Sequence, residues 1–188
     1  MRFLSLIPAV LALFFSATAQ AQVWSEWSDR ENRFTVNFPG DPVKTEVPYK
    51  TAKGTTLPSR IFTAEADPKS RLAGTYSVTV VDYMSAPADA ATAIAEAASA
   101  IRAKGVVKYD EANNIDQMAS WRLTIETPDN RRLLAEILMS AEKRLYIVQA
   151  ITSLKVPPPA QFQASVQILD EEGVRIRYKS VGSTERVR

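Results

Sequence analysis

The side chains that could do chemistry in this chain of 188 residues are carboxylates, lysines, tyrosines and hydroxyls, because the sequence contains no histidine and no cysteine. Those two residues supply most proton shuttles, thiol nucleophiles and transition-metal ligands in proteins. Their absence excludes a Ser-His-Asp or Cys-His triad, a zinc site of the His or Cys type, a histidine-ligated haem and a disulfide within the chain. Carboxylate, lysine, tyrosine or hydroxyl chemistry remains open, and the sequence gives no catalytic residue, metal ligand or cofactor to name.

One short motif has the spacing of a serine acyl enzyme. Ser140-Ala141-Glu142-Lys143 matches the Ser-x-x-Lys pattern, in which lysine activates a serine at the start of a helix. Here the motif lies between two apolar runs that are predicted as strands, residues 133–139 and 145–151. The partner motifs Ser-Asp-Asn and Lys-Thr-Gly do not occur in the sequence. We expect a turn between two strands at this position.

Residues 110–116 are rich in the oxygen ligands that hard cations such as calcium prefer. The oxygen-bearing side chains of this stretch are Asp110, Glu111, Asn113, Asn114 and Asp116. Their order lacks the spacing, the glycine and the terminal glutamate of an EF-hand, so we expect a solvated turn. A pair of carboxylates for hydrolysis could also form in space. The acids Asp82, Glu126 and Glu136 are instead expected on strand faces, opposite Arg or Lys.

Four residues near the start of the chain are candidate binding residues. Trp24, Trp27, Arg30 and Arg33 bring two indoles and two guanidinium groups close together in sequence. Tryptophan and arginine are enriched in the hot spots of protein interfaces, so these residues could form a recognition edge. The alternative is that both indoles cover the edge of a sheet as part of the core.

Residues 1–21 have the pattern of a secretory signal peptide. Arg2 gives a positive start, residues 3–15 are mostly apolar, and Ala19-Gln20-Ala21 gives the small-x-small pattern of a cleavage site. We expect cleavage between Ala21 and Gln22 and a periplasmic product. The alternative, an uncleaved membrane anchor, would need about 20 apolar residues, more than this run provides. A chain without cysteine also lacks the residue that carries the lipid of exported lipoproteins, so we expect no stable membrane insertion.

Size and charge point to one folded domain that does not bind nucleic acid. Residues 22–173 are expected to form a single domain, which at this size can bury roughly 70% of its unfolded surface without disulfides. Cleavage would remove one of 23 basic residues and leave 21 acidic ones, a net charge of +1. A dedicated nucleic-acid binder would be clearly basic. Residues 174–188 are more basic and form either an edge strand or a frayed tail that could attract an anionic lipid or acidic partner.

The predicted elements that must position these residues are strands, a helix, more strands and a second helix. Alternating Phe34, Val36 and Phe38 predict the buried face of a strand in an N-terminal hairpin. Further strands are predicted at residues 43–49, 57–66, 75–84, 106–109, 120–127, 133–139 and 145–151, with a turn at Lys53 and Gly54.

The two helices are predicted to cover opposite faces of a sheet. Residues 87–104 have an apolar stripe with helical spacing, an expected cap at Ser85 and a glycine after the last turn. After the prolines at 157–159, Phe162, Val166 and Leu169 recur at helical spacing over residues 160–170. The predicted fold class is α+β, a single domain in which a central, mostly antiparallel sheet is sandwiched between helices.

Residues 33–42 resemble a known family. The sequence Arg-Phe-Thr-Val-Asn-Phe-Pro-Gly-Asp-Pro is a strand that ends in Phe-Pro-Gly-x-Pro, and it resembles the opening of bacterial proteins of the PsbP-like superfamily. That resemblance implies an α/β/α sandwich and a non-catalytic accessory or binding role. The metal-binding histidines of plant members have no counterpart in this chain. No functional residue is carried over from the family.

The expected function is that of an exported, non-catalytic binding or accessory protein of the bacterial cell envelope. Its partner would be an envelope protein, bound by loops such as residues 67–74 or by the groove beside the alanine-rich helix. The alternatives are a carboxylate- or lysine-dependent hydrolase and a carrier of a small ligand or lipid. A hydrolase would need two acids that converge in a pocket, and a carrier would need an apolar cavity between sheet and helix. The sequence does not indicate the oligomeric state.

Overall fold

A computed structural model of the chain describes residues 24–86, 88–116, 118–178 and 186–187. The expected signal peptide, residues 1–21, and the expected cleavage site between Ala21 and Gln22 lie outside these residues. Within the described ranges, no helix has the length and apolar character needed to cross a bilayer.

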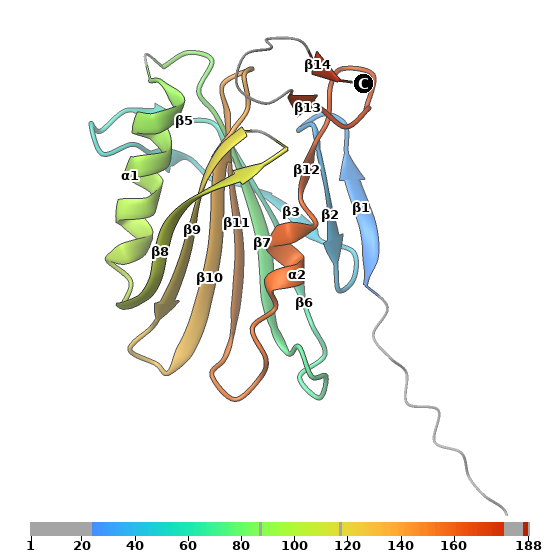
Figure 1. Cartoon of the computed structure of the whole chain (residues 1–188), viewed down its shortest axis with the longest axis vertical. Helices are drawn as coiled ribbons and strands as arrows, with labels where there is room; N and C mark the ends of the chain where they lie inside the picture. Colours follow the sequence, from blue (N-terminus) through green and yellow to red (C-terminus); the bar gives the residue numbers. More distant parts are fainter. Residues whose placement is uncertain (1–23, 87, 117, 179–185, 188) are drawn as a thin grey trace, which may run out of the picture.

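The centre of the fold is a seven-stranded antiparallel sheet (Figure 1). Its strands, in spatial order, are β3 (Val43–Glu46), β6 (Ser59–Glu65), β7 (Gly74–Asp82), β11 (Arg144–Ser153), β10 (Arg131–Met139), β9 (Met118–Glu126) and β8 (Val106–Ile115). Every neighbouring pair in this order is antiparallel. The predicted fold class is confirmed at this level: the protein is α+β with a large antiparallel sheet.

Smaller elements surround this sheet. The two helices are α1 (Ala90–Arg102) and α2 (Ala160–Ala164), and the remaining strands are β1 (Ser25–Asp29), β2 (Phe34–Phe38), β4 (Tyr49–Lys50), β5 (Thr56–Leu57), β12 (Gln167–Ile168), β13 (Arg177–Tyr178) and β14 (Arg186–Val187). The strands β1, β2 and β12 form one small sheet, β4 pairs with β5, and β13 pairs with β14. Residues 54 and 143 are turn positions with positive φ, as the predicted turns require.

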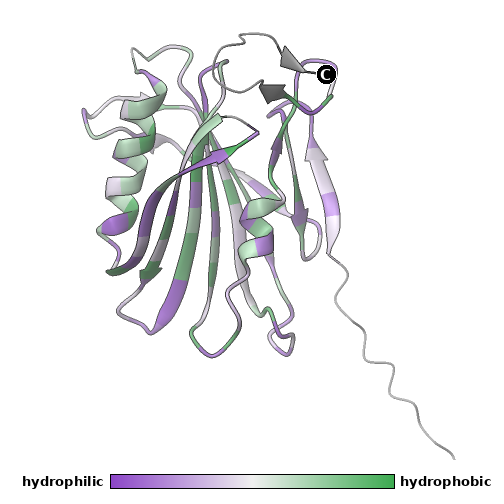
Figure 2. Cartoon of the chain, in the orientation of Figure 1, coloured by the Kyte–Doolittle hydropathy of each residue, from purple (hydrophilic) through white to green (hydrophobic). Residues whose placement is uncertain are grey.

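The middle strands are apolar on both faces because both faces of the sheet are covered. On β7, Val78 and Val80 point into one core and Val81 points into the other. Neighbouring residues of a strand point to opposite faces, so these two cores lie on opposite sides of the sheet. Figure 2 shows the same composition along the middle of β10, with hydrophilic residues at the lower end of the strand in that view. This explains the long apolar runs that predicted β10 and β11.

Helix α1 covers one face of the sheet. Asp89 caps its N-terminus by accepting a hydrogen bond from the Thr92 backbone N–H at 2.7 Å. Its buried stripe consists of Ala93, Ile94, Ala97, Ala98 and Ile101. These mostly small side chains let the helix pack closely on β9, β10 and β11. The helix predicted over residues 87–104 is confirmed, with observed bounds of 90 and 102, but the cap expected at Ser85 is wrong, because Asp89 is the N-cap.

The opposite face is covered mainly by the small sheet of β1, β2 and β12. Phe34 and Phe38 of β2 are fully buried against Phe62 of β6 and Phe162 of α2. The buried face predicted for the N-terminal hairpin is therefore confirmed. Helix α2 adds only five residues to this layer. The expected helical cover on both faces is not confirmed, because most of this second layer is β structure.

The prediction of a helix over residues 160–170 is wrong beyond residue 164. Ser165 ends α2, and β12 then pairs with β2 through Gln167 opposite Thr35 and Ile168 opposite Phe34. The apolar spacing of Phe162, Val166 and Leu169 is still used, because all three residues are buried. Backbone pairing with β2, which is remote in sequence, overrides the local helical pattern.

The prediction of a turn over residues 110–116 is also wrong. Residues 106–115 form the long edge strand β8, in which Asp110 pairs with Leu123 and Asn113 pairs with Ser120 of β9. Only the end of the stretch, at Asp116 with φ of 50°, lies in a turn. Polar residues fit this strand because most of its side chains are exposed at the edge of the sheet.

The first residues after 173 pack against the folded domain. Arg175 binds both carboxylate oxygens of Asp116 at 2.6 and 2.8 Å. Ile176 is buried in the aromatic core and donates its backbone N–H to the Ile168 carbonyl at 2.8 Å. The basic tail predicted from residue 174 is thus tied down at its start, whereas residues 179–185 and 188 lie outside the described residues.

An ion pair fastens the end of α1 to β8. Arg102 donates from Nε and Nη2 to the two oxygens of Asp110 at 2.6 and 2.8 Å. The Trp121 indole N–H donates to the same carboxylate. The hydrogen bonds from Arg102, and after them the one from Trp121, hold the pKa of Asp110 below its usual range.

The substitution Asp110→Asn is expected to lower the free energy of unfolding by about 1 kcal/mol near neutral pH, since a partly exposed bidentate pair contributes roughly that much. The pKa of Asp110 is lowered in the folded state. Its carboxylate therefore stabilises fully above the unfolded-state pKa of about 3.9, and this stabilisation is lost as the pH falls through the folded-state pKa. Urea unfolding near pH 7 and below about pH 3 measures the change. An equal difference between wild type and variant at both pH values would contradict this prediction.

Candidate functional site

A cleft of about 660 Å³ lies at one end of the molecule, next to α2. It is lined by Trp24, Asn37, Arg71, Leu72, Pro157, Pro158, Pro159, Ala160, Gln161 and Phe162. We call this the Trp24 cleft. It is formed by three segments that are far apart in sequence: the start of the N-terminal hairpin, the loop between β6 and β7, and the connection from β11 to α2 (Figure 1).

Trp24 is held in place by the aromatic core beneath it. Its ring meets Tyr76 edge-to-face at a centroid distance of 4.8 Å and Phe162 at 6.2 Å. Both partners are buried, whereas Trp24 itself is only partly buried. The indole therefore presents a fixed aromatic surface to the cleft, which is the property that makes tryptophan effective in recognition.

The loop between β6 and β7 forms the second wall. Its chain turns where Ser70 donates its backbone N–H to the Asp67 carbonyl at 2.8 Å. The Tyr76 hydroxyl donates to the Leu72 carbonyl at 2.6 Å and ties the loop to the core. Burial raises the pKa of Tyr76 to about 12, so this hydroxyl stays a donor at neutral pH.

Three successive prolines form the third wall. Pro157 and Pro158 are exposed, whereas Pro159 is buried and accepts a hydrogen bond from the Phe162 backbone N–H at 3.0 Å. Proline fixes φ and provides no N–H donor, so this wall is stiff and apolar. Arg132 donates to the Val156 carbonyl at 2.9 Å and anchors the chain just before the prolines.

The chemistry of the Trp24 cleft suits binding. Arg71 has the only charge among the residues that line it, and it makes no ion pair with a described residue. The other polar side chains of the lining are the amides of Asn37 and Gln161 and the indole N–H of Trp24. No carboxylate or lysine lines this cleft, so its described residues contain neither an acid–base pair nor an amine nucleophile.

The candidate binding residues predicted from the sequence lie in different places. Trp24 lines the cleft, whereas Trp27 packs against Phe34, Phe38 and Phe62 in the core. In the hairpin, Ser25 pairs with Phe38 and Asp29 pairs with Phe34. Because Arg30 and Arg33 follow Asp29 in the turn, they lie at the far end of the hairpin from Trp24. The four residues therefore do not form one edge.

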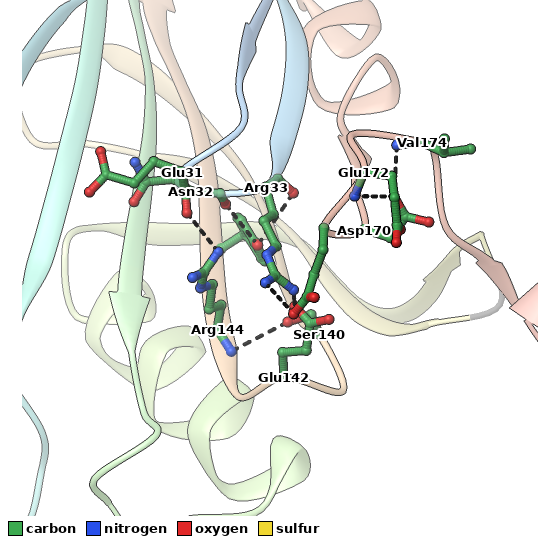
Figure 3. A network of polar contacts seen from close by, with 11 residues as sticks. Glu31, Asn32, Arg33, Ser140, Glu142, Arg144, Asp170, Glu172 and Val174 are labelled. Carbon is green, nitrogen blue, oxygen red and sulfur yellow. Dashed lines mark hydrogen bonds and ion pairs between the residues drawn. The ribbon is translucent and has the colours of Figure 1, made fainter.

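Arg33 belongs to a network of polar contacts that joins three turns (Figure 3). It makes ion pairs with Glu142 of the β10–β11 turn and with Glu171 of the turn after β12. In the same network Arg144 donates to the Glu31 carbonyl at 2.9 Å. Arg33 therefore fastens the turns to one another. Arg30 remains exposed beside Gly173.

The Ser-x-x-Lys motif forms the β10–β11 turn, as predicted. The Lys143 backbone N–H donates to the Ser140 carbonyl at 3.0 Å, and Ser140 Oγ accepts from the Arg144 backbone N–H at 3.4 Å. Lys143 is exposed in the turn with φ of 58°. The motif thus lies outside the helix start that the catalytic signature requires.

The acids considered as metal ligands or as a hydrolytic pair lie in the strands of the sheet or in the β8–β9 turn, where they form no such site. Within the described ranges, no three or more acidic side chains are grouped so that they could hold a metal ion. As predicted, Glu136 lies opposite Arg122, Glu126 lies opposite Arg132, and Asp82 lies opposite Arg144 in the sheet register.

Glu136 is the most buried of these acids. Its side chain is 0% exposed, and it accepts hydrogen bonds from Arg122 at 2.6 Å, from Asn113 at 3.1 Å and from the Ser120 hydroxyl. A buried carboxylate with three donors has satisfied hydrogen bonds and serves to hold β8, β9 and β10 together.

A second hollow, of about 550 Å³, lies in the groove beside the alanine-rich helix. It runs between the β4–β5 hairpin and α1, and Lys50 and Glu96 bring opposite charges to its lining. Ala95, Ala100 and Ala103 provide a flat side of small residues. The only aromatic residue that lines this groove is Tyr49. Tryptophan is the stronger anchor in binding hot spots, so the Trp24 cleft is the stronger candidate.

Sequence reasoning missed most of the residues that line the Trp24 cleft. It named Trp24 and the loop at 67–74, but it treated residues 157–159 only as the start of a helix. The signal that could have indicated a surface site is the run of three prolines next to Phe162, which predicts a stiff apolar segment. Arg71 and Leu72 lie in the loop at 67–74 that was expected to bind a partner, whereas Asn37 carries no signal of its own.

Comparison with known proteins gives a similar fold and no sequence relative. A scan against protein-family models gives no match, and a search of the curated proteins finds none either. The structure is similar to the solution structure of cyanobacterial PsbP (CyanoP) from Synechocystis sp. PCC 6803, with a TM-score of 0.48 and 12% sequence identity. The match covers 83% of this chain and 98% of that chain. The similarity concerns the fold alone.

A double-mutant cycle tests the structural role of Arg33. The side chains of Arg33 and Glu142 are 18% and 27% exposed, whereas Glu171 is 74% exposed. Because solvent screens the second pair more, Arg33→Ala and Glu142→Ala are expected to couple by about 0.5 to 1 kcal/mol, and Arg33→Ala and Glu171→Ala by less. Urea unfolding of the single and double variants measures both couplings. Equal couplings, or none for Glu142, would show that Arg33 does not join the turns in this way.

Proposed function

We propose that this chain is an exported, non-catalytic binding protein of the bacterial cell envelope that holds a segment of a partner protein in the Trp24 cleft. The observation that carries this proposal is the composition of the cleft. A rigidly supported indole, exposed prolines and an uncompensated arginine meet in one hollow of about 660 Å³. That volume lies within the usual range of ligand pockets, about 300 to 1,000 Å³.

The arrangement of the cleft matches the general anatomy of binding hot spots. These combine an aromatic or arginine anchor with neighbouring apolar surface that excludes water. Trp24 and Leu72 supply the apolar anchor, and Arg71 stands at the same site. The supporting core beneath Trp24 reduces the entropy that binding would otherwise cost, because the ring is already oriented.

The geometry gives less support to the two alternatives. A carboxylate-dependent hydrolase needs free acids in a pocket, and Asp110, Asp116 and Glu136 each bind an arginine. A lipid carrier needs an apolar cavity between sheet and helix, and that space is filled where Ala97 and Ile101 of α1 are buried in one core with Leu123. A role in binding a protein segment at the surface requires neither feature.

The proposed location outside the cytoplasm is based on the pattern of residues 1–21. Protein isolated from the periplasmic fraction is expected to begin at Gln22 when its N-terminus is sequenced. Protein that retains Met1, or that is recovered from the cytoplasm alone, would contradict the export proposal.

Site-specific crosslinking tests the proposed partner contact. A photoreactive residue at Gln161, which is exposed at the cleft, is expected to give a discrete adduct with one envelope protein in the cells that make this chain. The same residue at Ala91, which is exposed on α1, serves as the control position. Identical adducts from both positions, or adducts with abundant proteins alone, would overturn the proposal.

Substitution of the two N-terminal tryptophans provides a matched control for the cleft. Trp24→Leu is expected to reduce the Gln161 adduct at least about tenfold, because it removes the aromatic anchor. Such anchors contribute roughly 2 kcal/mol or more to the free energy of binding. Trp27→Leu removes an indole that packs on the same core but does not line the cleft. It should leave the adduct intact in protein shown by circular dichroism to be folded. Equal losses in both variants would show that the effect comes from the core.

A further inference from the structure

Much of the backbone that lines the Trp24 cleft is not available to pair with a partner as an additional β-strand. Residues Pro157, Pro158 and Pro159 have no N–H group to offer. On the opposite side, Leu72 donates its backbone N–H to Ser70 Oγ at 3.3 Å and accepts from Tyr76 at 2.6 Å. Asn37 donates its backbone N–H to Ser165 Oγ at 3.0 Å. These segments therefore favour recognition by side chains and by packing.

The side-chain groups that remain available in the cleft are mainly N–H donors, and the two amides among them also offer an acceptor oxygen. The indole N–H of Trp24, the amides of Asn37 and Gln161 and the guanidinium of Arg71 make no hydrogen bond to any residue the structure describes. The complementary ligand presents carbonyl oxygens without partners of their own. A polyproline II chain has this property, because it has no internal hydrogen bonds and its carbonyls point outward.

The apolar surface of the cleft fits the same ligand. Trp24 and Leu72 flank a wall of exposed prolines, and grooves lined by aromatic residues are the usual docking sites of proline-rich segments. Such a segment is already extended before it binds, so little conformational entropy is lost on docking. A flexible peptide of the same charge would pay that entropy at the moment of binding.

The charge of the cleft selects an acidic ligand. Arg71 has no carboxylate partner within the described ranges, and no acidic side chain lines the cleft. Lys69 and Lys155 are exposed in the two loops that form its walls and likewise make no ion pair with a described residue. Exposed Asp67, in the same loop as Lys69, offsets part of this positive charge, so the attraction for negative charge is centred on Arg71 in the cleft itself.

We infer that the partner segment held in the Trp24 cleft is a proline-rich stretch in the polyproline II conformation that carries an acidic residue against Arg71. This inference rests on the proposed function and specifies its ligand. Proline rings pack on Trp24 and Leu72, the ligand carbonyls accept hydrogen bonds from the side-chain donors, and the carboxylate pairs with the guanidinium of Arg71.

Synthetic peptides test the inference with the exported protein. The probe is a fluorescein-labelled peptide of about ten residues made of proline and alanine with a central glutamate, a length that spans roughly 31 Å as polyproline II. Two matched controls carry lysine in place of the glutamate, or glycine and serine in place of the prolines. Fluorescence anisotropy at low salt is expected to show binding of the first peptide at least about tenfold tighter than either control. The advantage over the lysine peptide should shrink as salt rises, because Arg71 is exposed.

Charge reversal at one position makes the test specific. Arg71→Glu is expected to reverse the preference, so that the lysine peptide binds more tightly than the glutamate peptide. Arg30→Glu removes the same charge from an exposed position at the far end of the hairpin and should leave the preference unchanged. Trp24→Leu should weaken binding of both proline-rich peptides.

The outcomes separate this inference from the proposed function. Equal affinity for all three peptides, or an acidic glycine-serine peptide that binds as tightly as the proline-rich one, overturns the inference. If crosslinking from Gln161 then still depends on Trp24, the proposed function stands with a different ligand. Preference for the acidic proline-rich peptide that is unaffected by Arg71→Glu also overturns the inference, since the charge would be recognised elsewhere.

Discussion

The structure depends on burying both faces of its three middle strands. Neighbouring residues of β7, β11 and β10 point into two separate cores, so each face of the sheet needs its own cover. Small side chains let α1 lie close to one face. A second sheet of β1, β2 and β12, with the short α2, covers the other. Because the chain has no cysteine, this burial must supply the stability that disulfides give to many exported proteins.

The Trp24 cleft is an extension of one of these cores to the surface. Inside this core lies an aromatic cluster that includes Phe34, Phe62 and Phe162. The cluster reaches the surface at the partly exposed ring of Trp24, which packs on Phe162. The rigidity of the site is thus a consequence of packing that the fold needs in any case. The walls are fixed in the same way, since Tyr76 holds Leu72 with a hydrogen bond from within the core. A site built on such support is oriented before a ligand arrives.

The sequence predicted the features that are encoded locally. The alternation at residues 34–38, the helical stripe over residues 93–101 and the turn at residues 140–143 each follow from a pattern within a few residues, and each is confirmed. The second half of strand β8 and the whole of strand β12 were missed because their structure comes from pairing with β9 and β2, which outweighs a polar or helical pattern. The cleft was missed for the same reason. Its walls come from segments near residues 24, 71 and 157–162, and nothing in a local window indicates that they meet.

The distribution of paired and unpaired charges separates the parts of the molecule that hold it together from the part available for recognition. Arg33, Arg102 and Arg175 each bind a carboxylate and join a turn or a helix end to the sheet. In such a pair the two charges largely cancel, so little electrostatic potential remains to attract a charged ligand. At the Trp24 cleft the balance differs, because Arg71 stands beside apolar surface without a carboxylate from the described residues. An uncompensated charge next to an aromatic anchor favours a complex that supplies the opposite charge, so the proposed complex would gain selectivity as well as affinity from Arg71.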